Sequence, residues 1–136
     1  MSVIVDTSVW SLALRRKALP TNSSIVATLQ DLIANDQVAL LGAIRQEILS
    51  GIRSSEQFIR LRNYLRALPD ITLAIEDYEL AAEFFNTCRS KGIQGSNTDF
   101  LICAAAHRRS FSIFTTDQDL QNFQAHIPIV LLPTQS

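Results

Sequence analysis

Short runs of β-branched residues alternate with longer helix-like segments along the whole chain, and this alternation restricts the fold more than any other feature. Strands separated by helices form parallel sheets through right-handed crossovers, with helices on both faces of the sheet. We therefore expect a three-layer α/β/α domain with a central, mostly parallel sheet of four to five strands. The expected strands are Val3–Val5, Val38–Leu41, Ile71–Ile75, Phe111–Thr115 and Ile127–Leu132. The expected helices are 7–16, 22–35, 42–52, 55–68, 76–91 and 98–109, with a short turn from Asp119.

Composition sets the class of protein. A chain of 136 residues with 47% hydrophobic residues fits one globular domain spanning residues 1–136, and it excludes a disordered chain. The formal charge of -1 argues against a strongly basic coat protein. No apolar run is long enough for a membrane span, and the start lacks the positive region of a signal peptide. Cys88 and Cys103 lack metal-ligand spacing, so we expect buried, reduced thiols in a cytoplasmic protein with no membrane partner.

Two carboxylates follow strands. Asp6 comes directly after the first strand, and Asp117 lies two residues after Thr115, the end of the fourth. Ligands of open α/β sheets bind beyond the carboxyl ends of the strands, so both side chains would lie at one edge if these strands are neighbours. Each has a simpler interpretation as well: Asp6 as a helix N-cap, and Asp117 as a turn residue or cap.

Two further carboxylates fall on apolar helix faces. Glu47 is three residues after Ile44 and four before Gly51, which places it on the predicted inward stripe. Asp99 shares a face with apolar residues at positions 102, 103 and 106. The alternatives are a rim residue paired with an arginine for Glu47 and an ordinary first-turn acid for Asp99.

Several carboxylates converge only if something cancels their mutual repulsion, and a divalent cation does so. Oxygen ligands favour Mg²⁺ or Mn²⁺, and Mg²⁺ usually binds one or two carboxylates directly while waters fill the other positions. Such a site suits phosphodiester hydrolysis, because the metal lowers the pKa of a bound water and stabilises developing negative charge.

Four segments carry a family resemblance. They are Val5-Asp6-Thr7-Ser8-Val9-Trp10, Arg45-Gln46-Glu47-Ile48-Leu49-Ser50-Gly51, Asn97-Thr98-Asp99-Phe100-Leu101-Ile102-Cys103-Ala104-Ala105-Ala106 and Thr115-Thr116-Asp117-Gln118-Asp119-Leu120. In this order and spacing, the sequence resembles the PIN-domain ribonucleases, and specifically the VapC toxins of type II toxin–antitoxin pairs.

The resemblance implies a set of site residues and partners. The acids that would hold Mg²⁺ or Mn²⁺ are Asp6, Glu47, Asp99 and Asp117. The supporting hydroxyl residues would be Thr7 or Ser8, together with Thr115, which would orient the last acid. The resemblance also implies a sheet of order 3-2-1-4-5, a homodimer, an RNA substrate and a VapB-like antitoxin that blocks the site.

The last motif departs from the family pattern. It offers both Asp117 and Asp119, followed by Leu120 where the family usually has Phe. Asp117 fits the pattern better, and Asp119 is either a water-mediated ligand or only a cap for the following turn.

Basic and apolar side chains suggest binding surfaces. Six arginines are candidates for contacts with RNA or the antitoxin, namely Arg15, Arg16, Arg53, Arg60, Arg62 and Arg66. The segment 55–68 is more apolar than one inward stripe requires, which hints at a groove for an amphipathic helix, although ordinary core packing also explains it.

Three functional hypotheses remain. The first is a metal-dependent endoribonuclease, and the second is a non-catalytic PIN-fold module that binds RNA or protein. The third, a nuclease for DNA or structured flaps, is disfavoured because the chain lacks room for an extra helical arch. No Ser/His/Asp or Cys/His motif and no glycine-rich phosphate loop supports other chemistry.

Overall fold

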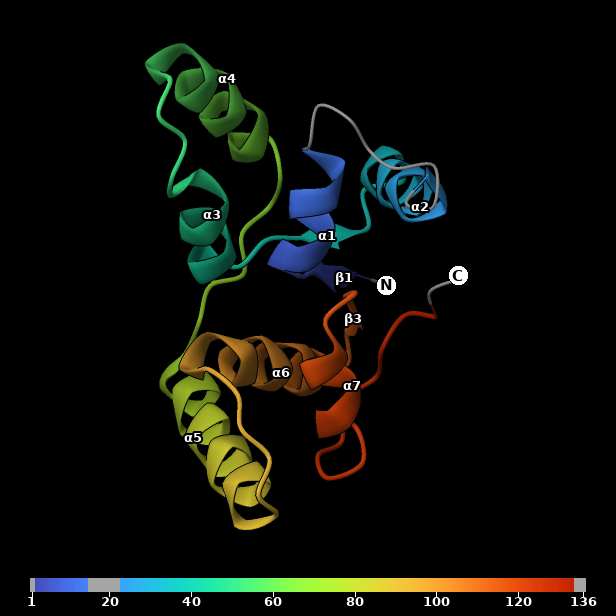
Figure 1. The fold of residues 1–136 in the computed structure, drawn as a ribbon, viewed down its shortest axis with the longest axis vertical. Helices are drawn as coiled ribbons and strands as arrows, with labels where there is room; N and C mark the ends of the chain where they lie inside the picture. Colours follow the sequence, from blue (N-terminus) through green and yellow to red (C-terminus); the bar gives the residue numbers. More distant parts are fainter. Residues whose placement is uncertain (1, 15–22, 134–136) are drawn as a thin grey trace.

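A three-stranded parallel sheet forms the centre of the computed structural model, which describes residues 2–14 and 23–133 (Figure 1). Its order is β2-β1-β3, with β1 at Val3–Val5, β2 at Val38–Ala39 and β3 at Ser112–Phe114. Val3 pairs with Val38 on one side and with Ser112 on the other. All three residues of β1 are buried, as expected for a central strand covered on both faces.

Two further segments extend the sheet by one bridge each. Asp70 lies beside Leu40 and Leu131 beside Ile113, both in parallel orientation. Numbered along the chain, the five segments therefore follow the order 3-2-1-4-5, as expected. The α/β fold with a parallel sheet is confirmed.

The prediction of a strand at 71–75 is wrong, because pairing with the sheet stops after Ile71. Ile71 N–H donates to the carbonyl of Leu40 (2.9 Å), but the next backbone groups bond to side chains instead. The carbonyl of Thr72 accepts from Arg109 Nη2 (3.2 Å), and the N–H of Ala74 donates to Asp77 Oδ2 (2.8 Å). Because Asp77 caps the chain at this point, the segment turns directly into a helix.

The strand predicted at 127–132 is also shorter than expected. Ile113 N–H donates to the carbonyl of Val130 (2.9 Å), and Leu132 N–H donates to the carbonyl of Ile113 (2.8 Å). Pro128 and Pro133 on either side have no N–H to donate to a sheet. The pairing is therefore confined to one bridge.

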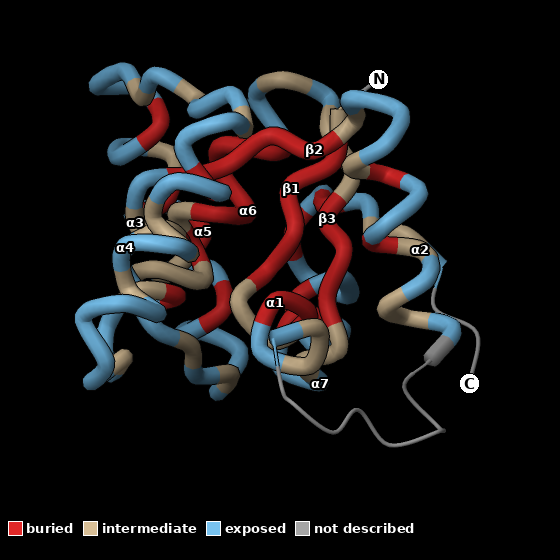
Figure 2. The backbone as a smooth tube through the Cα atoms, turned by 90° about the horizontal axis from the view of Figure 1, so that it is seen from above, coloured by how far each residue is buried: buried red, intermediate tan, exposed pale blue. Residues whose placement is uncertain are grey.

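Helices surround the sheet. Their bounds are α1 Thr7–Ala13, α2 Ser23–Ala34, α3 Gly42–Leu49, α4 Ser55–Arg66, α5 Ile75–Ser90, α6 Asn97–Arg109 and α7 Gln118–Phe123. Figure 2 shows α3 to α6 on one side of the buried strands and α2 on the other, with α1 and α7 following the carboxyl ends of β1 and β3. Arg15 and Arg16, predicted to end the first helix, lie outside the described residues.

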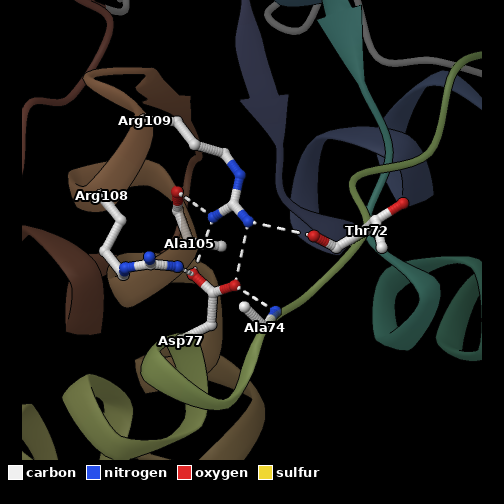
Figure 3. Close-up of polar contacts among 6 residues, drawn as sticks. All are labelled: Thr72, Ala74, Asp77, Ala105, Arg108 and Arg109. Carbon is white, nitrogen blue, oxygen red and sulfur yellow. Dashed lines mark hydrogen bonds and ion pairs between the residues drawn. The ribbon is translucent and has the colours of Figure 1, made fainter.

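An ion-pair cluster that the sequence pattern does not predict joins α5 to α6. The fully buried carboxylate of Asp77 receives Arg108 Nη1 (2.8 Å) and both terminal nitrogens of Arg109 (2.7 and 2.9 Å; Figure 3). These bonds, from Arg109 first, hold the pKa of Asp77 well below its usual range against the opposing effect of burial. Asp77 is therefore a structural anion, neutralised within the protein.

The interior has no disulfide among the described residues. Cys88 and Cys103 are buried free thiols, as expected, and burial raises the pKa of both. Across residues 2–14 and 23–133, no helix has the length and apolar character needed to cross a membrane.

Candidate functional site

Asp6 is the first carboxylate at the carboxyl edge of the sheet. Its N–H donates to the carbonyl of Phe114 (2.8 Å), which brings the ends of β1 and β3 level. Its side chain is buried, and Oδ2 accepts hydrogen bonds from Thr115 Oγ1 (2.8 Å) and Ser8 Oγ (2.9 Å). Asp6 occupies the N-cap position of α1 but makes no side-chain capping bond. Helix capping therefore does not account for this carboxylate.

The two hydroxyls that bind Asp6 are oriented by the loop after β3. Thr116 N–H donates to Ser8 Oγ (3.1 Å), and Asp117 N–H donates to Thr115 Oγ1 (3.0 Å). A hydroxyl has one proton, so a hydroxyl that accepts from the backbone can direct that proton to Asp6. Ser8, rather than Thr7, is thus the residue that assists Asp6, and Thr115 links Asp6 to the backbone of Asp117.

Asp99 lies at the start of α6, half-buried. Its Oδ2 accepts from Ser96 N–H (3.2 Å), and its own N–H donates to Ser96 Oγ (3.1 Å), a reciprocal capping box. The role as a first-turn acid is therefore real, but it does not describe the whole environment. Burial raises the pKa of Asp99, and the charges of Asp6 and Asp117 raise it further. Asp6 and Asp117 are therefore both close enough to Asp99 to repel it.

Asp117 and Asp119 differ in position. Asp117 is half-buried and caps α7, because its Oδ1 accepts from the N–H of Asp119 (2.9 Å). Asp119 is exposed in the first turn of that helix. The capping alternative for Asp117 is thus correct, while its charge also acts on Asp99.

Glu47 is exposed, so its predicted place on an inward stripe is wrong. The predicted stripe includes Gly51, but α3 ends at Leu49 and Gly51, with a φ of +88°, is not part of the helix. Only Ile44 and Ile48 define the buried face of this short helix, and Glu47 lies at its margin. Glu47 Oε1 accepts from Thr7 Oγ1 (3.1 Å), and no arginine of the described residues pairs with it.

The carboxylates of Asp6, Asp99 and Asp117 at the carboxyl end of the sheet are called the acidic edge below. Their oxygen atoms suit a hard cation but do not form a complete metal site. Asp6, Asp99 and Asp117 offer only oxygen, and no Lys or Arg within residues 2–14 and 23–133 forms an ion pair with any of them. In the same ranges, no three His, Cys, Asp or Glu side chains are grouped closely enough to hold a metal together. A Mg²⁺ ion that takes one or two carboxylates and completes its shell with water fits this arrangement.

Comparison with known proteins decides the family. Residues 3–125 match the PIN domain. The chain belongs to the PIN-domain family. No curated protein matches the sequence.

Solved structures share the fold of this PIN domain. VapBC2 from Rickettsia felis, bound to a promoter DNA fragment, has a TM-score of 0.77 at 20% identity, with 97% of this chain and 98% of that chain covered. FitAcB from Neisseria gonorrhoeae has a TM-score of 0.72 at 20% identity, with 96% of each chain covered. VapC20 from Mycobacterium tuberculosis, a toxin that cleaves the sarcin-ricin loop, has a TM-score of 0.66 at 16% identity, covering 94% of this chain and 98% of that chain.

A groove of about 760 Å³ lies between the first four helices of the PIN domain. Its apolar lining includes Trp10, Leu29, Ile33, Ile48, Leu61 and Tyr64. Glu47 also lines it, and Glu47 binds Thr7, the residue that follows Asp6 in the sequence. Of the apolar side chains of segment 55–68, Leu61 and Tyr64 line the groove, whereas Leu65 is packed in the core. The contributions of α1 and α2 to the groove were not predicted.

Proposed function

We propose that this PIN domain is a Mg²⁺- or Mn²⁺-dependent endoribonuclease and the toxin of a type II, VapBC-like toxin–antitoxin pair. The observation that carries the proposal is the environment of Asp6. A buried carboxylate is costly unless its charge is compensated, and among the described residues only two neutral hydroxyls bind Asp6. A bound divalent cation supplies the missing compensation.

The residues at the acidic edge would have different roles in this reaction. Asp6, Asp99 and Asp117 would hold the metal directly or through water, with Glu47 and Asp119 at the outer side. The metal, when bound, would activate water and stabilise charge on the phosphate. Ser8 and Thr115 fix the orientation of Asp6, because both hydroxyls bind its Oδ2 and both are held by backbone N–H groups. Burial and the charges of Asp6 and Asp117 raise the pKa of Asp99, and a bound cation would relieve that repulsion.

RNA is the proposed substrate, and the proposed site of action is the cytoplasm. The similarity to VapC20, which is described as a toxin that cleaves the sarcin-ricin loop, supports an RNA substrate, although the likeness itself concerns the fold. Arg53, Arg60 and Arg66 are exposed near the groove helices and are candidates for phosphate contacts.

A VapB-like antitoxin and a second copy of the chain are the proposed partners. The groove between α1 and α4 has the apolar lining that an amphipathic helix needs, and it leads to Glu47 at the site. An antitoxin segment in this groove would block access to the acidic edge. The similarity to VapBC and FitAB structures supports such a partner.

The test uses the purified chain, freed of any copurifying antitoxin, and total RNA with or without Mn²⁺. We expect Mn²⁺-dependent cleavage by the wild type and none by Asp6→Asn, with Asp31→Asn on the exposed face of α2 as the matched control. Binding of RNA without cleavage would instead favour the non-catalytic module. Equal cleavage by Asp6→Asn and the wild type would exclude the proposed site.

A further inference from the structure

Gly95, in the loop between α5 and α6, lies directly against two aromatic rings. A Cβ placed on Gly95 would be 2.4 Å from Cζ of Phe123 and 2.9 Å from Cε2 of Phe100. Carbon atoms pack favourably at about 3.5 to 4.0 Å, so no residue with a side chain fits here without movement. Both rings are buried in the core.

The two rings connect the helices that carry Asp99 and Asp117. Phe100 follows Asp99 in α6, and Phe123 is the last residue of α7, which Asp117 caps. Their rings are stacked with centroids 4.6 Å apart and an angle of 26° between planes. Phe85 of α5 packs edge-on against Phe100, with centroids 5.5 Å apart, so the stack is anchored in a third helix.

The same loop also orients Asp99 directly. Ser96 follows Gly95, and its N–H and Oγ make the two bonds of the capping box with Asp99. A displacement of Gly95 therefore reaches Asp99 through Ser96, and a displacement of Phe123 reaches Asp117 through the short helix α7.

We propose that Gly95 is a positioning residue of the acidic edge: its missing side chain lets the loop rest on the Phe100–Phe123 stack and sets the spacing between Asp99 and Asp117. Its consequence for metal binding rests on the proposed function, whereas its effect on the geometry of the two acids does not. A Gly→Ala change elsewhere usually stabilises a fold or leaves it unchanged when φ allows it. At Gly95 the clash reverses that expectation.

The test compares Gly95→Ala with Gly42→Ala, a glycine of α3 with no atom within 4 Å of its added Cβ. Without metal, we expect the amide NMR signals of Asp99 and Asp117 to shift in Gly95→Ala and not in Gly42→Ala. With Mn²⁺, calorimetric titration of folded protein should show affinity weakened about tenfold or more in Gly95→Ala only. A purely structural role would lower the melting temperature and leave the affinity of the folded fraction unchanged.

A compensating variant keeps the proposal testable if Gly95→Ala does not fold. Phe123→Leu removes the nearer of the two ring contacts that the new Cβ meets and leaves the one with Phe100, so Gly95→Ala with Phe123→Leu should fold and recover part of the Mn²⁺ affinity. Unchanged Asp99 and Asp117 signals in folded Gly95→Ala, or a double variant no better than Gly95→Ala, would overturn the proposal. If the wild type binds no Mn²⁺, the proposed function fails, and the metal-free NMR signals still decide the role of Gly95.

Discussion

Two buried aspartates of this molecule are compensated in opposite ways. Asp77, at the junction of α5 and α6, has a fully buried side chain and receives three bonds from two guanidinium groups. Asp6, at the edge of the sheet, is 5% exposed and receives two bonds from neutral hydroxyls. Both residues are buried, but of the two only Asp77 meets positive charge within the described chain.

The difference separates an anion that serves the fold from one that is available to a ligand. Arginine pairing cancels the charge of Asp77, which therefore has nothing left to offer a cation. The hydroxyls at Asp6 fix its orientation without adding a positive charge, and Asp6 and Asp117 both lie near enough to Asp99 to repel it. A buried carboxylate without a cation partner is therefore a better guide to this site than burial alone.

The largest effect is expected for Asp77→Asn, which would leave two guanidinium groups without their anion. Breaking a buried pair by removing one partner costs about 3 to 5 kcal/mol, and the partial exposure of both arginines places this variant near the lower end. Urea unfolding measures the change. The matched control is Asp70→Asn, which breaks the more exposed pair with Arg45 and should cost less than about 1 kcal/mol. Equal losses of unfolding free energy in Asp77→Asn and Asp70→Asn would contradict the conclusion that the buried ion pairs of Asp77 stabilise the fold more than an exposed pair does.

Asp6→Asn, unlike Asp77→Asn, should barely change the free energy of unfolding and should abolish most of the RNA cleavage. The amide keeps an oxygen that accepts from Ser8 and Thr115 and removes the uncompensated charge, so the free energy of unfolding should change by less than about 1 kcal/mol. RNA cleavage in Mn²⁺ should fall by about 100-fold or more, as expected when a metal ligand is lost. Unfolding in urea and cleavage of total RNA provide the two readouts. A loss of stability as large as that of Asp77→Asn would show that Asp6 serves the fold.

Acid and base should act oppositely on Asp77 and Asp99. The folded-state pKa of Asp77 is lowered, so its stabilisation is complete above the ordinary pKa of about 3.9 and is lost as the pH falls below it. The folded-state pKa of Asp99 is raised, so ionised Asp99 opposes folding increasingly as the pH rises above that same value. Metal-free Asp99→Asn should thus be slightly more stable than the wild type at pH 7 and equal to it in acid. Thermal unfolding across pH tests this, and a constant difference between the two proteins would contradict it.

The smallest effect is expected for Glu56→Gln on α4. Its pair with Arg60 is the i,i+4 type with both side chains largely exposed, and such pairs contribute about 0.3 to 0.5 kcal/mol. Urea unfolding of Glu56→Gln should therefore barely differ from that of the wild type. If Glu56→Gln lost more than about 1 kcal/mol of unfolding free energy, solvent would not be screening this surface pair. Burial would then not explain why the ion pairs of Asp77 contribute more.

The fold was predictable where local pattern and tertiary packing agree. The β-branched run at Val3–Val5 became the central strand, and the helices recur near their expected bounds. The segment 71–75 alternates like a strand, but Asp77 and Arg109 take its backbone partners, and that competition involves residues far apart in sequence. Periodicity cannot reveal such a long-range contact.

The site was predictable in part for the same reason. Strand ends fix Asp6 and Asp117, so their neighbourhood followed from the order of the strands. Glu47 was placed on the wrong face because the helix ends earlier than the pattern indicated. Nothing in the sequence distinguishes Asp77 from other first-turn acids, since its two arginines lie 31 and 32 residues away.

The most direct test of the account is calorimetric titration of Mn²⁺ into the metal-free wild type and Asp6→Asn, each shown by unfolding to be equally stable. We expect binding by the wild type and an affinity weakened about tenfold or more in Asp6→Asn. Equal Mn²⁺ affinity in the two proteins, or no binding by the wild type, would contradict the claim that the charge of Asp6 is held for a cation.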